Sequence, residues 1–421
     1  MPPLEAWEKV LVGGEFLADI HNIQNCISCH GGVAEVDDME VAHEGVVRDP
    51  LEDSERACSV CHTETADVVA TSLHQNLTGM REGLIARGAD FTDPHMQEAW
   101  DNHCTDCHTT CGQCHISRPT AMGGGLLKEH EVKKIASMKD TCMACHGARV
   151  SNEYLGNNEG VEGSVHWLEG GMSCFECHDV SEYHGDGTEH ANRYDGAPGV
   201  NCLDCHPEAE PGQSEILEHN IHDGKVACEV CHVSGPYKSC YNCHTAVDDQ
   251  GLPYFKTDDS QLTFRIGHNP NKSEDRPWEY VLVRHAPVAK DTFAFYGDDL
   301  LPGFDDMPTW KYATPHNIQR VTPQNESCNS CHGNEDIFLT ADDVAAEELA
   351  ANADVIVKSV PPAFDWVHSE EEDAEFAWGE YAPIEPITPP SPGVNWIGLL
   401  GIGVSIAGVA AVPLVLRRKG H

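Results

Sequence analysis

The stretch Cys104-Thr-Asp-Cys-His-Thr-Thr-Cys-Gly-Gln-Cys-His115 holds two copies of a five-residue unit, Cys-x-x-Cys-His, separated by only two threonines. The unit recurs eight more times, and the ten copies, numbered here motifs 1 to 10 in chain order, use all 20 cysteines of the chain. The motifs consist of Cys26, Cys29 and His30; Cys58, Cys61 and His62; Cys104, Cys107 and His108; Cys111, Cys114 and His115; Cys142, Cys145 and His146; Cys174, Cys177 and His178; Cys202, Cys205 and His206; Cys228, Cys231 and His232; Cys240, Cys243 and His244; and Cys328, Cys331 and His332. No cysteine is left over for a separate disulfide framework.

Each unit has the spacing of a c-type haem attachment signal. Two thiols three residues apart can reach the vinyl groups of one porphyrin, and the adjacent histidine lies beneath the iron as its proximal ligand. The sequence therefore predicts ten covalent haem c groups. The alternative, zinc or an iron–sulfur cluster, fits best at Cys104, Cys107, Cys111 and Cys114, whose spacing in isolation resembles a cluster site.

A second axial ligand is expected for each low-spin haem, and the remaining histidines can supply it. The chain has 26 histidines, of which ten close the motifs and His421 lies beyond the predicted membrane span. The distal candidates are His21, His43, His74, His95, His130, His166, His184, His219, His222, His285 and His316, with His103, His190, His268 and His368 as weaker ones. This surplus predicts bis-histidine ligation, which leaves no open coordination position and favours outer-sphere electron transfer at low potentials.

The fold class expected is a multihaem cytochrome c with little regular secondary structure, in which short helices and loops wrap a chain of haems. Residues 26–332 provide about 31 residues per haem, too few to enclose each porphyrin in its own core. The haems should therefore fill much of the interior and act as covalent staples. The 37 glycines and 25 prolines agree with sparse regular structure.

Changes in motif density and in amino-acid composition divide the chain into five parts. We predict a nine-haem body at 1–244, an aromatic-rich lobe with the tenth haem at 245–360, an acidic proline-rich stalk at 361–393, a transmembrane helix at 394–416 and a tail at 417–421. The lobe either docks a partner or packs against the body and returns histidines to haems bound elsewhere. Within the lobe, Tyr280–Val283 predicts a strand, and Thr340 with Asp343 predicts a capped helix running to about Ala351.

The expected anchor is residues 394–416, an uncharged run of 23 residues that is long enough to cross a hydrocarbon core of about 30 Å. Trp396 lies near one end, and Arg417, Arg418 and Lys419 follow the other. The positive-inside rule then places the tail in the cytoplasm and the haem body on the extracytoplasmic face, periplasmic or at the cell surface. A buried soluble helix is the alternative.

Export is also required by the haem motif, because attachment takes place outside the cytoplasm. Residues 1–22 show no basic segment followed by an apolar one. We therefore expect either that the numbering begins at a mature or trimmed end or that the start of the gene is misplaced.

The formal charge of −43 limits the partners. Nucleic acid would be repelled, whereas basic redox proteins or cations would be attracted. An acidic surface that keeps the protein soluble in salt explains the charge equally well.

The motif stretch Cys104–Pro119, together with Cys142–Val150 and Val165-His-Trp167, resembles multihaem c-type cytochromes, and more loosely the octahaem tetrathionate reductase and hydroxylamine oxidoreductase group. The resemblance covers about residues 20–335. It implies one special haem with a lysine or an open site, but all ten motifs here end in histidine. A distal lysine among Lys128, Lys133, Lys134 and Lys139 stays open, and ten haems with a C-terminal anchor depart from that group.

Three functions compete at this point. The first is a membrane-anchored electron carrier, not an enzyme, between a membrane donor and an extracytoplasmic acceptor. The second is an oxidoreductase of nitrogen or sulfur compounds with one open-site haem. The third is a subunit of a polymeric cytochrome filament.

Overall fold

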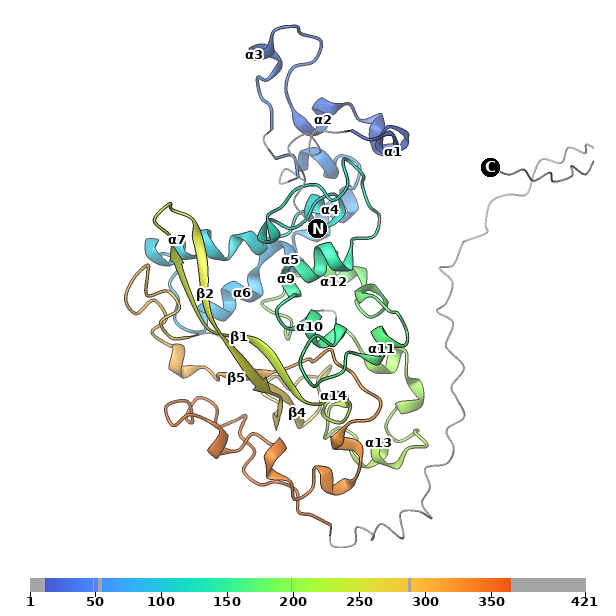
Figure 1. The fold of residues 1–421 in the computed structure, drawn as a ribbon, viewed down its shortest axis with the longest axis vertical. Coiled ribbons are helices and arrows are strands. Elements are labelled where there is room, and N and C mark those ends of the chain that lie inside the picture. The colour runs from blue at the N-terminus through green and yellow to red at the C-terminus, as the bar shows by residue number, and fades with distance from the viewer. Residues whose placement is uncertain (1–11, 48, 52–54, 198, 287–288, 365–421) are drawn as a thin grey trace, which may run out of the picture. The chain divides into compact units, whose positions relative to one another are not determined.

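The computed structural model describes residues 12–47, 49–51, 55–197, 199–286 and 289–364 (Figure 1). No helix in these ranges is longer than the ten residues of α7. The helices are α1 (Gly14–Ala18), α2 (Cys26–His30), α3 (Met39–Ala42), α4 (Thr63–Val69), α5 (Leu73–Asn76), α6 (Thr78–Ile85), α7 (Pro94–His103), α8 (Cys111–His115), α9 (Met143–His146), α10 (Val150–Leu155), α11 (Val165–Leu168), α12 (Val180–His184), α13 (Leu217–Ile221) and α14 (Cys228–His232). Short helices joined by loops are therefore the dominant structure.

Most motifs begin a helical turn, and such a turn suits the spacing of their cysteines. Three motifs coincide with a whole α-helix, namely α2, α8 and α14. A helical turn brings residues three apart to the same face, so the two thiols of a Cys-x-x-Cys pair can address one porphyrin edge. Asn25 and Thr110, which directly precede motifs 1 and 4, cap their helices by accepting a hydrogen bond from the backbone N–H three residues on.

Motif 9 is different, because it lies in a β-strand. Strand β1 (Pro236–Val247) pairs antiparallel with β2 (Pro253–Thr263), and the register shifts between Tyr241 and His244. In a regular strand, Cys240 and Cys243 would point to opposite faces. The irregularity, with Asn242 in the left-handed region at φ 48°, changes this alternation within the motif.

A second, three-stranded antiparallel sheet has the order β3 (Arg265–His268), β4 (Tyr280–His285), β5 (Trp310–Tyr312). The strand predicted at Tyr280–Val283 is confirmed, and Val281, Leu282 and Val283 are all buried. The largest apolar core gathers around this sheet and includes Phe338, Leu339 and Val355. It also draws on Ala227, Val230, Val233 and Tyr237, so the segment around motif 8 packs with the lobe.

The helix predicted from Thr340 to Ala351 is wrong. Thr340 and Asp343 do form a reciprocal capping box, but the 3₁₀ turn that they cap ends at Asp343. Val344, the next residue, has an extended backbone, and its side chain is buried in the apolar core. Tertiary packing therefore overrides the local helix signal.

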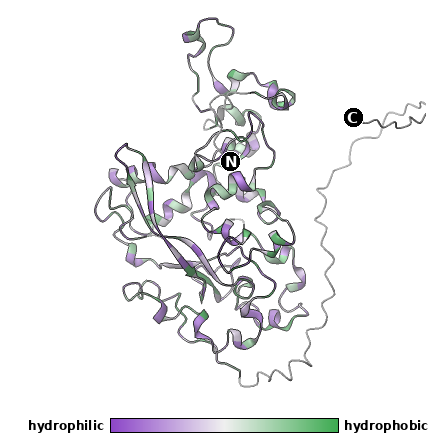
Figure 2. Cartoon of the chain, in the orientation of Figure 1, coloured by the Kyte–Doolittle hydropathy of each residue, from purple (hydrophilic) through white to green (hydrophobic). Residues whose placement is uncertain are grey.

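Hydrophobic residues also occur along the short helices of the N-terminal half, as well as in the sheets (Figure 2). Ile20 and Ile23, which flank His21, are 71% and 78% exposed.

The predicted stalk lies outside the described residues except for 361–364, and the predicted span at 394–416 lies wholly outside them. Within the part of the chain that is described, none of the helices has the length and apolar character needed to cross a bilayer.

Candidate haem-binding sites

Seven pairs of histidine rings lie at nearly the same separation, and each pair joins one motif histidine to one histidine from elsewhere. The ring centroids are 6.1 to 6.3 Å apart in the pairs His62–His21, His30–His130, His146–His74, His115–His184, His206–His166, His178–His316 and His232–His219. Other aromatic contacts spread from 4.3 Å for Tyr237–Phe264 to 6.1 Å for Tyr154–Trp167. The narrow range of the histidine pairs points to one shared geometry.

That geometry fits an iron between the rings. With a metal–imidazole bond of about 2 Å on each side, two axial imidazoles of one iron have their centroids about 6 Å apart. The rings can rotate about that axis, which accommodates interplanar angles from 17° for His178–His316 to 69° for His74–His146. The residues present therefore fit a haem held by two histidines.

In many of these rings Nδ1 bonds to the protein, which leaves the other ring nitrogen, Nε2, for a metal. Backbone carbonyls accept from three of them, with distances of 2.6 Å for His115 to Lys133, 3.0 Å for His232 to Gln319 and 3.2 Å for His74 to Glu182. Carboxylates lie at 2.5 Å for His21 with Asp19, 2.8 Å for His178 with Glu182 and 3.1 Å for His206 with Glu208. Hydroxyls of Ser164 and Ser214 bond to His166 and His219.

Three other histidines use Nε2 within the protein. Nε2 of His103 lies 2.7 Å from the Tyr296 hydroxyl, and that of His190 lies 3.1 Å from Asp186. His285, a predicted distal ligand, points Nε2 at Glu348 at 3.3 Å. In each of these three rings, Nε2 therefore contacts a side chain of the protein.

The structure brings seven of the eleven predicted distal ligands against a motif histidine and leaves His43, His95, His222 and His285 elsewhere. His43 and His222 each bond through Nδ1 to the carbonyl four residues earlier. Of the weaker candidates, His268 lies beside Tyr280 and His368 is outside the described residues.

Motifs 3, 9 and 10 end in histidines that have no second histidine at this spacing among the described residues. Nδ1 of His244 lies 3.6 Å from Asp291, and that of His332 lies 3.2 Å from the Pro362 carbonyl. The ring of Phe364 lies 4.5 Å from that of His332. Among the described residues, the seven-pair pattern therefore provides no second axial ligand for a haem at motifs 3, 9 or 10.

The cysteines form no disulfides in the described part of the chain, and many of them meet cysteines of neighbouring motifs. The four cysteines of motifs 3 and 4 interact with cysteines of three other motifs: Cys104 with Cys243, Cys111 with Cys58, and both Cys107 and Cys114 with Cys145. Among the described residues no three ligating side chains converge as in a metal cluster. Burial raises the pKa of the Cys104 thiol to about 12.

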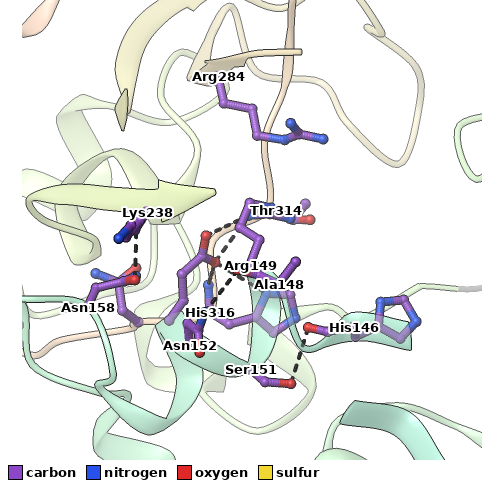
Figure 3. Close-up of polar contacts among 12 residues, drawn as sticks. His146, Ala148, Arg149, Ser151, Asn152, Asn158, Lys238, Arg284, Thr314 and His316 are labelled. Atoms are coloured by element: carbon purple, nitrogen blue, oxygen red, sulfur yellow. Dashed lines mark hydrogen bonds and ion pairs between the residues drawn. The ribbon is translucent and has the colours of Figure 1, made fainter. Parts of the chain in front are cut away.

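A buried ion pair joins two of the candidate haem sites (Figure 3). Glu153 on α10 is 1% exposed and accepts from Arg149 Nη1 at 2.8 Å. Its carboxylate also accepts from the backbone N–H of His316 at 3.0 Å. Burial raises the pKa of Glu153 despite the arginine. Because α10 closely follows motif 5 and His316 pairs with motif 6, this carboxylate fixes the two sites relative to each other.

Sequence reasoning missed Glu153 and Glu182. The second was detectable, since Glu182 lies four residues after His178 and a helical turn brings such pairs together. The pair of Glu153 with Arg149 has the same spacing of four, but the contact of Glu153 with His316, which is 163 residues away, was not detectable. Of the lysines left open as distal ligands, Lys128 bonds to Glu15 at 2.6 Å.

No family model, curated protein or solved structure matches the chain. The resemblance to multihaem cytochromes thus stays a prediction from the motifs.

Proposed function

We propose that this chain is a decahaem c-type cytochrome that carries electrons between a membrane donor and an extracytoplasmic acceptor. The observation that carries the proposal is the set of seven histidine pairs, each with one motif histidine, at 6.1 to 6.3 Å. Haem supplies the one-electron Fe(III)/Fe(II) couple when bound. The chain supplies the ligands, the burial and the nearby charges that set each potential.

The residues contribute to this function in three ways. Hydrogen bonds to Nδ1 fix the ring planes and present Nε2. With an imidazole on each face, the iron would have no position for a substrate. This favours outer-sphere electron transfer over reactions at the metal. The acidic residues, 69 against 26 basic ones, favour the ferric state and attract basic partners.

A matched pair of variants tests the ligand assignment. In His184→Ala, the haem of motif 4 loses its second ligand, so one haem in ten should become high-spin by electron paramagnetic resonance. In His190→Ala, the spectrum should stay unchanged, because His190 Nε2 is bound to Asp186. Mass spectrometry of the purified protein should show ten covalent haems; markedly fewer would contradict the proposal.

A second function, an oxidoreductase with an open-site haem, is favoured by one observation. His108, His244 and His332 belong to no histidine pair of this spacing in the described part of the chain. A high-spin signal worth one to three haems in the unmodified protein, removed by nitrite or hydroxylamine, would support the enzyme. A wholly low-spin spectrum would support the carrier.

A further inference from the structure

The outer edge of strand β2 is exposed and unpaired. Strands β1 and β2 form a long hairpin (Figure 1), and β2 has a strand neighbour on one side only among the described residues. Within that part of the chain, no backbone group of β2 bonds to a backbone group outside the hairpin. Residues 253–259 are all exposed. The N–H and C=O groups along such an edge are a template for pairing with another strand.

The edge is also regular, which pairing with a second strand requires. The register shift of the hairpin lies between Tyr241 and His244, so the extra residue belongs to β1. Strand β2 keeps its alternation, which places Lys256 and Asp258 on the same face. Charges on an edge strand commonly block pairing. These two charges have opposite signs, however, and can therefore attract a matching edge.

The bonding pattern of antiparallel strands restricts how two copies of this edge can pair. Residues directly opposite each other either both point their N–H and C=O groups at the neighbouring strand or both point them away. Because these orientations alternate along a strand, the two-fold axis that relates two identical edges passes through a residue and not between two residues. The register is therefore set by the residue of β2 that faces its own copy.

An axis at Thr257 pairs unlike charges. Lys256 of each copy then lies opposite Asp258 of the other, and Thr257 faces its own copy. Opposite charges and threonine pairs stabilise antiparallel neighbours, whereas an axis at Lys256 or Asp258 would place like charges opposite each other. With the axis at Thr257, the ladder runs from Pro253 to Gln261, which is most of the strand.

The other central positions suit pairing less well. An axis at Asp259 would again place two carboxylates opposite each other. An axis at Phe255 would leave Lys256 opposite Tyr254 and would shorten the ladder to residues 253–257. The edge is therefore complementary to itself in one register.

We propose that this chain forms a two-fold dimer in which the β2 strands of two copies pair antiparallel with the axis at Thr257. The joined sheet has the order β1, β2, β2, β1, with two strands from each copy. A two-fold contact uses the same surface on both copies, so it closes at two chains. The net charge of −43 repels the copies at a distance, so the dimer should need salt, which at about 0.15 M screens charges more than about 8 Å apart.

The dimer brings the two copies of motif 9 together, because Cys240, Cys243 and His244 all lie in β1. With neighbouring strands about 4.8 Å apart, the two β1 strands lie about 14 Å apart. An electron can then pass between the two haems of motif 9, so that one iron is oxidised as the other is reduced. This consequence rests on the proposed function, whereas the pairing rests on β2 alone.

Charge exchange beside the axis tests the pairing in the intact, detergent-extracted protein. By sedimentation velocity at about 0.15 M salt, the unmodified chain should be a dimer. Lys256→Asp and Asp258→Lys should each weaken the dimer about tenfold, because each places like charges opposite each other twice. A mixture of the two variants should dimerise again, since one chain is then acidic and the other basic at both positions. Hydrogen exchange in residues 253–261 of the unmodified protein should slow as its concentration rises.

Lys272→Asp is the matched control, because it changes the net charge equally at an exposed lysine outside the hairpin. It should leave the dimer affinity unchanged. A monomer at every concentration would overturn the pairing, and so would a dimer or polymer on which Lys256→Asp and Lys272→Asp have equal effects. If a variant does not fold, hydrogen exchange of the unmodified protein decides, and exchange in residues 253–261 that is independent of concentration would overturn the pairing.

The haem count separates this inference from the proposed function. A monomer with ten haems by mass spectrometry would overturn the pairing and leave the proposed function standing. A dimer that responds to the charge exchange but has markedly fewer haems would overturn the proposed function and leave the pairing. Asp258 accepts from Asn242 of motif 9 at 3.4 Å, so the same count on Asp258→Lys shows whether that motif stays loaded.

Discussion

Residues 12–225 and 226–364 contain the same kind of motif but bury their apolar side chains very differently. Of the 29 buried hydrophobic residues in the described ranges, seven lie in the first region and 22 in the second. Of the 25 exposed large hydrophobic residues there, 20 lie in the first region and five in the second. The second region has an ordinary core around a sheet, whereas the first leaves most of its large apolar side chains in this comparison exposed.

Under the proposed function, this contrast marks where porphyrin would substitute for polypeptide. Soluble proteins leave single apolar residues exposed without consequence, but a run of them marks a surface that something else covers. Seven motifs lie within residues 12–225, and each haem would bring a large apolar face. We infer that haem supplies the interior of the first region, whereas residues 226–364 supply most of their own.

Withholding haem should have the most severe consequence. In a host without haem attachment, residues 12–225 should lose their fold, while the core around β4 should still protect residues 226–364 from protease. Limited proteolysis followed by mass spectrometry measures this directly. Equal protection of the two regions would remove the distinction.

The second largest effect is expected on the free energy of unfolding, from changes to the buried carboxylate of Glu153. Glu153→Ala leaves Arg149 buried without its partner, which costs about 3–5 kcal/mol in such pairs. Glu153→Gln should cost less, because its amide oxygen can still accept from the backbone N–H of His316. Chemical denaturation of the haem-loaded protein measures both, with the exposed Glu159→Gln as the control.

A pair of apolar truncations compares the regions residue by residue. Leu339→Ala opens a cavity in the lobe core and should cost about 2–5 kcal/mol. Ile23→Ala, at a position 78% exposed, should cost more than the about 0.5 kcal/mol of an ordinary surface change if haem covers it. A cost near zero for Ile23→Ala in the haem-loaded protein would argue that haem leaves this surface bare.

The mildest change should be in a single redox potential. Glu182 accepts from His178 Nδ1 and strengthens that ligand, so Glu182→Gln should raise the midpoint potential of one haem. Glu208→Gln should shift the haem of motif 7 less, because the Glu208 side chain is 73% exposed and screened by solvent. Redox titration followed by visible spectroscopy separates the two, and equal shifts would argue against a role for burial.

Local signals made part of this structure predictable. The β-branched and aromatic residues of Tyr280–Val283 predicted the correct strand, and seven of the ten motifs supply one histidine of a pair. The pairing itself was not predictable, because His178 and His316 lie far apart in the sequence and only the fold brings them together. The helix from Thr340 failed for the same reason, since a local capping box does not reveal that Val344 is needed in the core.

The irregularity in β1 has a consequence for how haem motifs are counted. Asparagine tolerates a left-handed backbone better than most residues do, and Asn242 adopts one between the two cysteines of motif 9. A β-branched residue there would favour a regular strand and turn the thiols to opposite sides. Such a change would leave Cys240, Cys243 and His244 untouched and yet cost a cofactor, so an intact signature in a gene does not guarantee a haem in the protein.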